Sequence, residues 1–123
     1  MTVAELYAQI GGDYEEALSR LSMDMLVERF IVKLLDDTSC RDLCAAWEAG
    51  DEAAAFKAAH AAKGVYANLA LADLTRLASA ITEALREGNE DLRATTDVDA
   101  LVGELSAKYA KVTAAIEAFA AQG

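Results

Sequence analysis

Apolar residues recur along this chain with the period of an α-helix. The clearest case lies near the C-terminus, in the series Leu101, Leu105, Tyr109 (or Lys108), Val112, Ile116 and Phe119. A second series precedes residue 36 and consists of Met25, Leu26, Phe30 and Leu34, with Val27 at its edge. Spacings of three and four residues place side chains on one face of a helix. We therefore expect both faces to enter a hydrophobic core.

Residues that cap helices divide the first part of the chain. Thr2, with a glutamate three residues later, forms a capping box and predicts a short helix over 2–9. Asp13 is placed to cap the next turn, and Ser22 is expected to cap the helix after it. The pattern leaves open whether 22–49 is one bent helix or two helices in series.

Three aspartates mark helix starts in the rest of the chain, namely Asp51, Asp73 and Asp97. Four substantial helices with short connections predict an all-α fold, an antiparallel up-down four-helix bundle with short additional N-terminal helices. We expect a single domain over 1–123, with the bundle core at about 22–121.

Composition narrows the classes of partner. With 54% hydrophobic residues, 26% charged residues and no proline, the chain has the make-up of a folded helical protein. The formal net charge of -10 disfavours binding to nucleic acid or to an anionic membrane. No apolar run approaches the roughly 20 residues of a membrane span, and no signal peptide is evident. We expect a cytoplasmic protein, monomeric by default.

Metal and nucleotide chemistry have little support in the sequence. Cys40 and Cys44 are four residues apart, which is not a zinc-ligand spacing, and the chain has one histidine to assist them. We expect two reduced cysteines that act as small apolar side chains. No GxxxxGK[ST] phosphate loop is present, so ATP binding is not expected.

The single histidine, His60, lies in the helical stretch "AFKAAHAAKGVYANLA". With residues about 100° apart, the side of the helix opposite His60 is wholly apolar and is predicted to face the core. That core face comprises Ala55, Ala58, Ala59, Ala62, Val65, Tyr66 and Leu69. Phe56 and Gly64 lie about 40° to either side of His60, and Lys57 and Lys63 about 60°. The imidazole is therefore predicted to be exposed.

The surroundings of His60 suit a bound anion. No Asp or Glu occurs from Ala53 to Ala72, although the chain has 21 of them. Gly64 costs about 1 kcal/mol in a helix interior, and on the His60 side it would clear space for another molecule. An exposed imidazole with Lys63 one turn away is able to accept a phosphoryl group, while the ammonium offsets the added charge. Without a site for ATP, the group must come from another protein and go to another protein.

The segment "HAAKGVYANLALADL" resembles the signature of histidine phosphotransfer (HPt) domains, His-x-x-Lys-Gly followed by small residues and a leucine. The resemblance covers roughly Met23 to Asn89. It implies that His60 is phosphorylated on its distal ring nitrogen, that Lys63 stabilises the phosphoryl group, and that Gly64 lets a partner approach. The chain would then be a phosphorelay carrier and not an enzyme.

The resemblance also implies the partners. These would be response-regulator receiver domains and/or a hybrid histidine kinase, and the receiver would supply Mg²⁺, so no cofactor is expected on this chain. The docking face would include Ala53, Phe56, Lys57, Ala67 and, on the next helix, Ser79. Many family members carry a glutamine where this sequence has Thr82, whose shorter hydroxyl puts that contact in doubt. "NLA" also replaces the commoner Asn-Leu-Gly, which is expected to affect how that helix ends.

Two other functions remain open at this point. A helical bundle that binds a signalling partner without phosphotransfer would share the exposed face but would not need the imidazole. A small enzyme or metal protein has less support, because one histidine and no ligand cluster are present.

Overall fold

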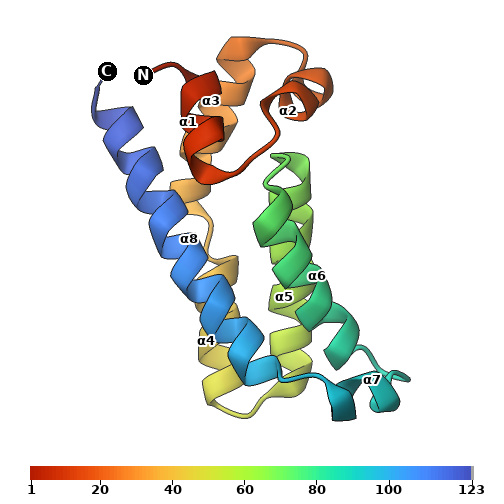
Figure 1. Ribbon diagram of the computed structural model, residues 1–123. Coiled ribbons are helices and arrows are strands. Elements are labelled where there is room, and N and C mark those ends of the chain that lie inside the picture. The colour runs from red at the N-terminus through yellow and green to blue at the C-terminus, as the bar shows by residue number, and fades with distance from the viewer. Residues whose placement is uncertain (123) are drawn as a thin grey trace.

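The computed structural model describes residues 1–122, and every regular element in that range is helical (Figure 1). The elements are α1 (Val3–Ile10), α2 (Tyr14–Leu21), α3 (Asp24–Lys33), the 3₁₀ turn η1 (Leu34–Asp36), α4 (Ser39–Glu48), α5 (Glu52–Asn68), α6 (Ala72–Leu85), α7 (Glu90–Thr95) and α8 (Val98–Ala121). The prediction of an all-α fold is confirmed.

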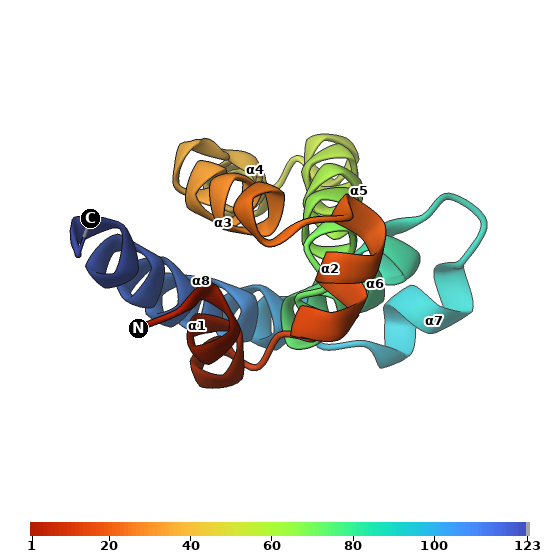
Figure 2. The same ribbon diagram turned by 90° about the horizontal axis from the view of Figure 1, so that it is seen from above.

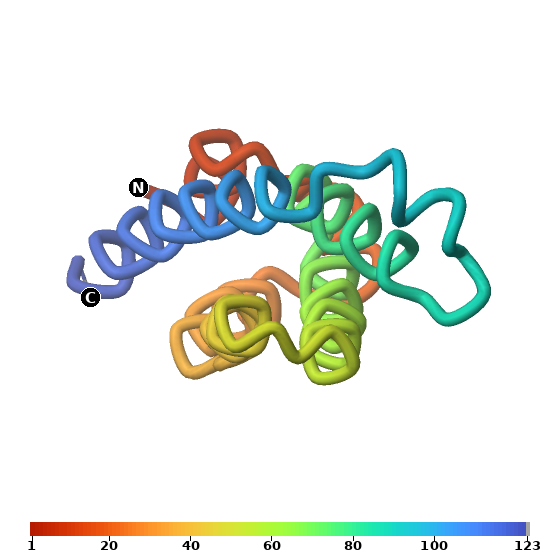
Figure 3. The backbone as a smooth tube through the Cα atoms, turned by 90° about the horizontal axis from the view of Figure 1, so that it is seen from below, coloured from red at the N-terminus to blue at the C-terminus, as the bar shows by residue number. Residues whose placement is uncertain are grey.

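The long helices lie side by side. α5 packs against α4 and α6, and α8 packs against α6 and α4, so the four surround a common core (Figure 2). Consecutive helices in this set run in opposite directions along the chain (Figure 1). α1 and α2 cover one end of the assembly, and α7 lies beside α6 at the other end (Figure 3).

The segment 22–49 proves to be two helices in series, α3 and α4, joined through η1. α8 holds this junction, because the Tyr109 hydroxyl lies 3.2 Å from the Leu34 carbonyl oxygen and 3.4 Å from the Asp37 carbonyl oxygen, and can donate to either. Carbonyls freed by the interrupted helix thus find a donor on a neighbouring helix.

Four of the predicted N-caps are present. The side chains of Thr2, Asp13, Asp51 and Asp97 each accept a hydrogen bond from a backbone N–H three residues later, at 3.0–3.1 Å. The prediction for Ser22 is wrong. Ser22 ends α2 in the left-handed region, with φ 74°, and α3 begins after Met23 without a side-chain cap.

The predicted apolar face of α3 is also partly wrong. Val27 and Ile31 are fully buried, whereas Met25 is 63% and Phe30 40% exposed. Leu34 is buried as expected. Both sets fit the helical period, and the packing of α3 against α1, α2 and α8 selects between them.

The C-terminal end of α5 is held by the N-terminal helices. The Tyr7 hydroxyl donates to the Leu69 carbonyl oxygen at 2.9 Å, and the Asp13 N–H donates to the Ala70 carbonyl oxygen at 2.9 Å. Ala70, in the "NLA" sequence, has φ 56°, a left-handed conformation that glycine adopts more readily. The helix therefore ends in a strained turn that the contacts with α1 and α2 support.

Candidate functional site

The core face of α5 lies where the sequence predicts it. Its fully buried residues are alanines and Tyr66, with Leu69 at 6% exposure, while Ala58 and Val65 at the edges are half-buried. Alanine side chains let α4 and α6 approach α5 closely. Packing on this side fixes the rotation of α5, so the opposite side must face outward.

His60 lies on that outward side and is exposed, as predicted. Its ring is nearly parallel to that of Phe56, one turn earlier, with an interplanar angle of 11° and centroids 6.0 Å apart. Gly64, one turn later, is exposed, and a Cβ placed there would meet nothing within 4 Å. The helix surface beside the imidazole is therefore open to an approaching molecule.

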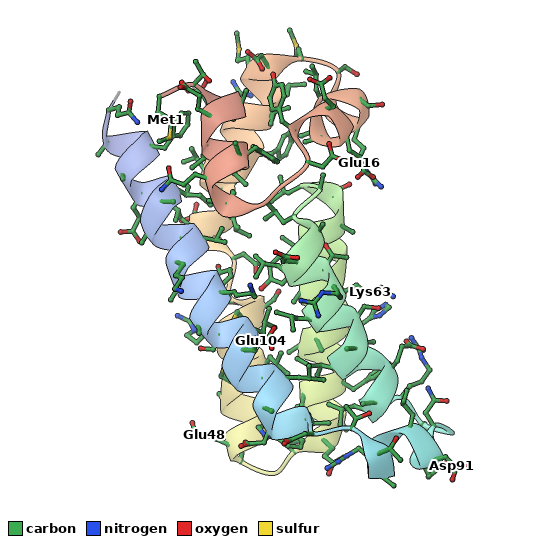
Figure 4. The ribbon with its side chains drawn as sticks, viewed as in Figure 1. Met1, Glu16, Glu48, Lys63, Asp91 and Glu104 are labelled. Atoms are coloured by element: carbon green, nitrogen blue, oxygen red, sulfur yellow. The ribbon has the colours of Figure 1, made fainter. Side chains whose placement is uncertain are left out.

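Two lysines of α5 accompany the imidazole. Lys57 is exposed, and Lys63 is half-buried. Figure 4 shows Lys63 at the α5–α6 side of the molecule, on the flank away from α8. A lysine with a partly covered stem keeps its ammonium close to the helix surface, where it acts on charge placed at His60.

Glu83 on α6 and Arg86, the residue that follows α6, are two charged groups that the sequence did not point to. The Arg86 guanidinium lies 5.3 Å from the centroid of the Phe56 ring, within the range of a cation–π contact. The same guanidinium donates two hydrogen bonds to Glu83 Oε2, at 2.8 Å from Nη2 and 3.1 Å from Nε. His60, Phe56, Arg86 and Glu83 thus form a continuous row of contacts across the two helices.

The carboxylate of Glu83 lies in the field of the site's cations. The hydrogen bond from Arg86 lowers the pKa of Glu83 most, and the positive charges of Arg86, Lys63 and His60 lower it further. In turn, the hydrogen bond to Glu83 raises the pKa of Arg86. The sequence suggested surroundings without a carboxylate. That holds for residues 53–72, but α6 brings the Glu83 carboxylate into the electrostatic field of His60 and Lys63.

Thr82, the residue of α6 expected to lie beside the histidine, makes its hydrogen bond elsewhere. Thr82 is fully buried, and its hydroxyl donates to the Ala78 carbonyl oxygen of its own helix at 2.7 Å. The hydroxyl proton is therefore engaged inside the helix interface, and we do not assign Thr82 a role at the imidazole. Ser79, one turn before it, is half-buried.

The remaining residues of the predicted docking face surround His60 on α5. Ala53 and Lys57 are exposed, and Phe56 and Ala67 are half-buried. Their role in docking stays a prediction. Arg86 joins them from the C-terminal end of α6, a position that only the packing of α6 on α5 could reveal.

The cysteines lie apart from this surface, on α4. Cys40 is buried and Cys44 half-buried, and both are free thiols. Burial raises the pKa of the Cys40 thiol to about 12. Across residues 1–122, no group of three His, Cys, Asp or Glu side chains is arranged to hold a metal ion. Nor does any helix in that range have the length and apolar character needed to span a membrane.

Comparison with protein families identifies a match. The family model described as "Hpt domain" matches residues 25–120, which include all of α4 to α7, most of α3 and nearly all of α8. No curated protein and no solved structure matches the chain. The matched region contains His60, Lys63, Gly64 and the charged pair on α6.

Proposed function

Since this chain belongs to the Hpt domain family, whose members carry out histidine phosphotransfer in two-component systems, we propose that it carries a phosphoryl group on His60. The group would pass between this imidazole and aspartates of response-regulator receiver domains. The observation that supports the proposal is the exposed imidazole of His60 on α5, with Lys63 one turn away and open space at Gly64.

The reaction needs little from this chain beyond a well-placed nucleophile. The lone pair of the distal nitrogen, Nε2, attacks the phosphorus of an aspartyl phosphate. The P–O bond to the aspartate breaks, and the carboxylate leaves with its electron pair, so no oxidant or reductant is involved. The reverse step returns the phosphoryl group to another aspartate. The Lys63 ammonium offsets the negative charge that His60 gains.

The receiver domain would supply the Mg²⁺ and most of the catalysis, which makes this chain a carrier and not an enzyme. We interpret α3–α4, α5, α6 and α8 as an antiparallel four-helix bundle whose core holds the imidazole in a fixed orientation. A receiver, or the receiver of a hybrid kinase, would dock over the face that includes Ala53, Phe56, Lys57, Ala67 and Ser79. We further propose that the protein acts as a cytoplasmic monomer.

Transfer of label from a phosphorylated receiver tests the proposal. Each receiver domain encoded by the same genome is phosphorylated, mixed with the protein, and the protein is checked for acid-labile label. We expect at least one receiver to label the wild type and none to label His60→Gln. Label on His60→Gln would refute the assignment of the acceptor. A receiver that binds the wild type and never transfers label would instead favour a phosphorylation-independent interaction module.

A further inference from the structure

The charged pair Glu83–Arg86 is not needed to explain a phosphoacceptor histidine, yet it lies beside one. Arg86 contacts the face of Phe56, whose ring is stacked against His60, and Glu83 holds Arg86 through two hydrogen bonds. Both side chains of the pair are 41% exposed, so neither is locked in place by burial. The pair is thus close to the site and free to rearrange.

Phosphorylation of His60 would change the charge balance around this pair. A phosphate group carries roughly -1.5 to -2 charges near neutral pH. The cations around the imidazole are Lys57 and Lys63 on α5 and Arg86 at the C-terminal end of α6, and Arg86 is already paired with Glu83. A phosphoryl group on the imidazole would therefore compete with the Glu83 carboxylate for Arg86, and the two anions would repel each other.

We propose that Glu83 and Arg86 form an electrostatic latch that limits how tightly the protein retains its phosphoryl group. While His60 is unmodified, Glu83 holds Arg86. Once His60 is phosphorylated, Arg86 turns toward the phosphoryl group and Glu83 is left as an unpaired neighbouring anion. The phosphorylated state is then less stable than it would be without the carboxylate, which favours onward transfer. This inference rests on the proposed function.

The position of Glu83 in the field of the site supports this role. The hydrogen bond from Arg86 lowers the pKa of Glu83 most, and the charges of Arg86, Lys63 and His60 lower it further. Because the cations near the imidazole interact electrostatically with this carboxylate, an anion placed on the imidazole will interact with it too. Because both side chains of the pair are partly exposed to solvent, the effect is expected to be modest.

The test uses phosphoramidate as the phosphoryl donor, so that no cognate receiver is required. The P–N bond of phosphoramidate breaks, ammonia leaves with a proton, and His60 Nε2 takes the phosphoryl group. At a fixed ratio of phosphoramidate to ammonia, the phosphorylated fraction measured by ³¹P NMR gives an equilibrium constant. We expect Glu83→Gln to raise this constant about threefold to fivefold.

Glu16→Gln is the matched control. Glu16 pairs with Arg20 at 2.9 Å, and the two side chains are 47% and 49% exposed, so the ion pair is nearly equivalent. It lies on α2, well above Lys63 in the view of Figure 4. We expect Glu16→Gln to leave the equilibrium constant unchanged, because its charge is remote from His60.

Two further measurements separate the latch from a structural role. Arg86→Gln should lower the equilibrium constant for phosphorylation. In the Arg86→Gln background, Glu83→Gln should raise this constant by a smaller factor than it does in the wild type. The NMR signal of the Arg86 Nε–H should move on phosphorylation of the wild type.

The outcomes are distinguishable. If the wild type is labelled on His60 and Glu83→Gln has the same equilibrium constant for phosphorylation as the wild type, the latch proposal is wrong and the carrier function stands. If phosphoramidate does not label His60 in the wild type, the carrier function itself fails.

Discussion

Replacing Gly64 by alanine is expected to raise the stability of the protein and to slow phosphotransfer. Apart from its chain neighbours and the backbone of its own helix, the added methyl would meet no atom within 4 Å, and Gly64 is not among the residues with positive φ. Alanine is favoured over glycine by about 1 kcal/mol in a helix interior, so the free energy of unfolding should rise by about that amount. For a protein of 123 residues this corresponds to an increase in Tm of about 3–5 °C.

The same methyl should hinder phosphotransfer. If a receiver approaches His60 over Gly64, an extra carbon in that contact acts as overpacking, which costs about 1–3 kcal/mol in a well-packed core. We therefore expect kcat/KM for transfer from a phosphorylated receiver to fall about 5- to 150-fold. A more stable protein with slower transfer is a combination that damage to the fold does not produce.

Gly103→Ala provides the control. Gly103 lies inside α8, is exposed, and a Cβ there would also meet nothing within 4 Å. The Gly103→Ala variant should show the same increase in the free energy of unfolding and should accept the phosphoryl group at the wild-type rate. Urea unfolding gives the stability of both variants, and initial rates with limiting receiver give kcat/KM. Wild-type transfer by Gly64→Ala would refute the idea that this glycine clears the approach to His60.

Two further predictions concern the packing at Gly12 and the reactivity of the two cysteines. Gly12→Ala should destabilise the protein by about 1–3 kcal/mol in urea unfolding, because a Cβ would lie 2.7 Å from Tyr7 Cδ2 and 3.1 Å from Leu71 Cδ2. Wild-type stability would show that these two side chains move aside freely. In native protein at pH 8, iodoacetamide should modify the half-buried Cys44 while sparing Cys40, whose burial raises its pKa to about 12. Mass spectrometry with and without urea checks this, and rapid native labelling of Cys40 would contradict it.

The outward direction of His60 could be predicted from the sequence because it depends on one helix alone. The apolar residues of α5 leave a single arc for the core, and the imidazole lies opposite. The caps at Thr2, Asp13, Asp51 and Asp97 could be predicted for the same reason, since each involves a side chain and a backbone N–H three residues away.

Features that join two helices could not be predicted in this way. Counting along the chain pointed to Thr82 as the neighbour of His60, yet Thr82 is buried and bonded to its own helix, while Arg86 and Glu83 reach the site. The helical pattern predicts Phe30 in the core, whereas its side chain lies at the surface. The helical period fixes which residues of one helix share a face. The rotation and register of one helix against another depend on how all their side chains pack, and only the tertiary structure decides that.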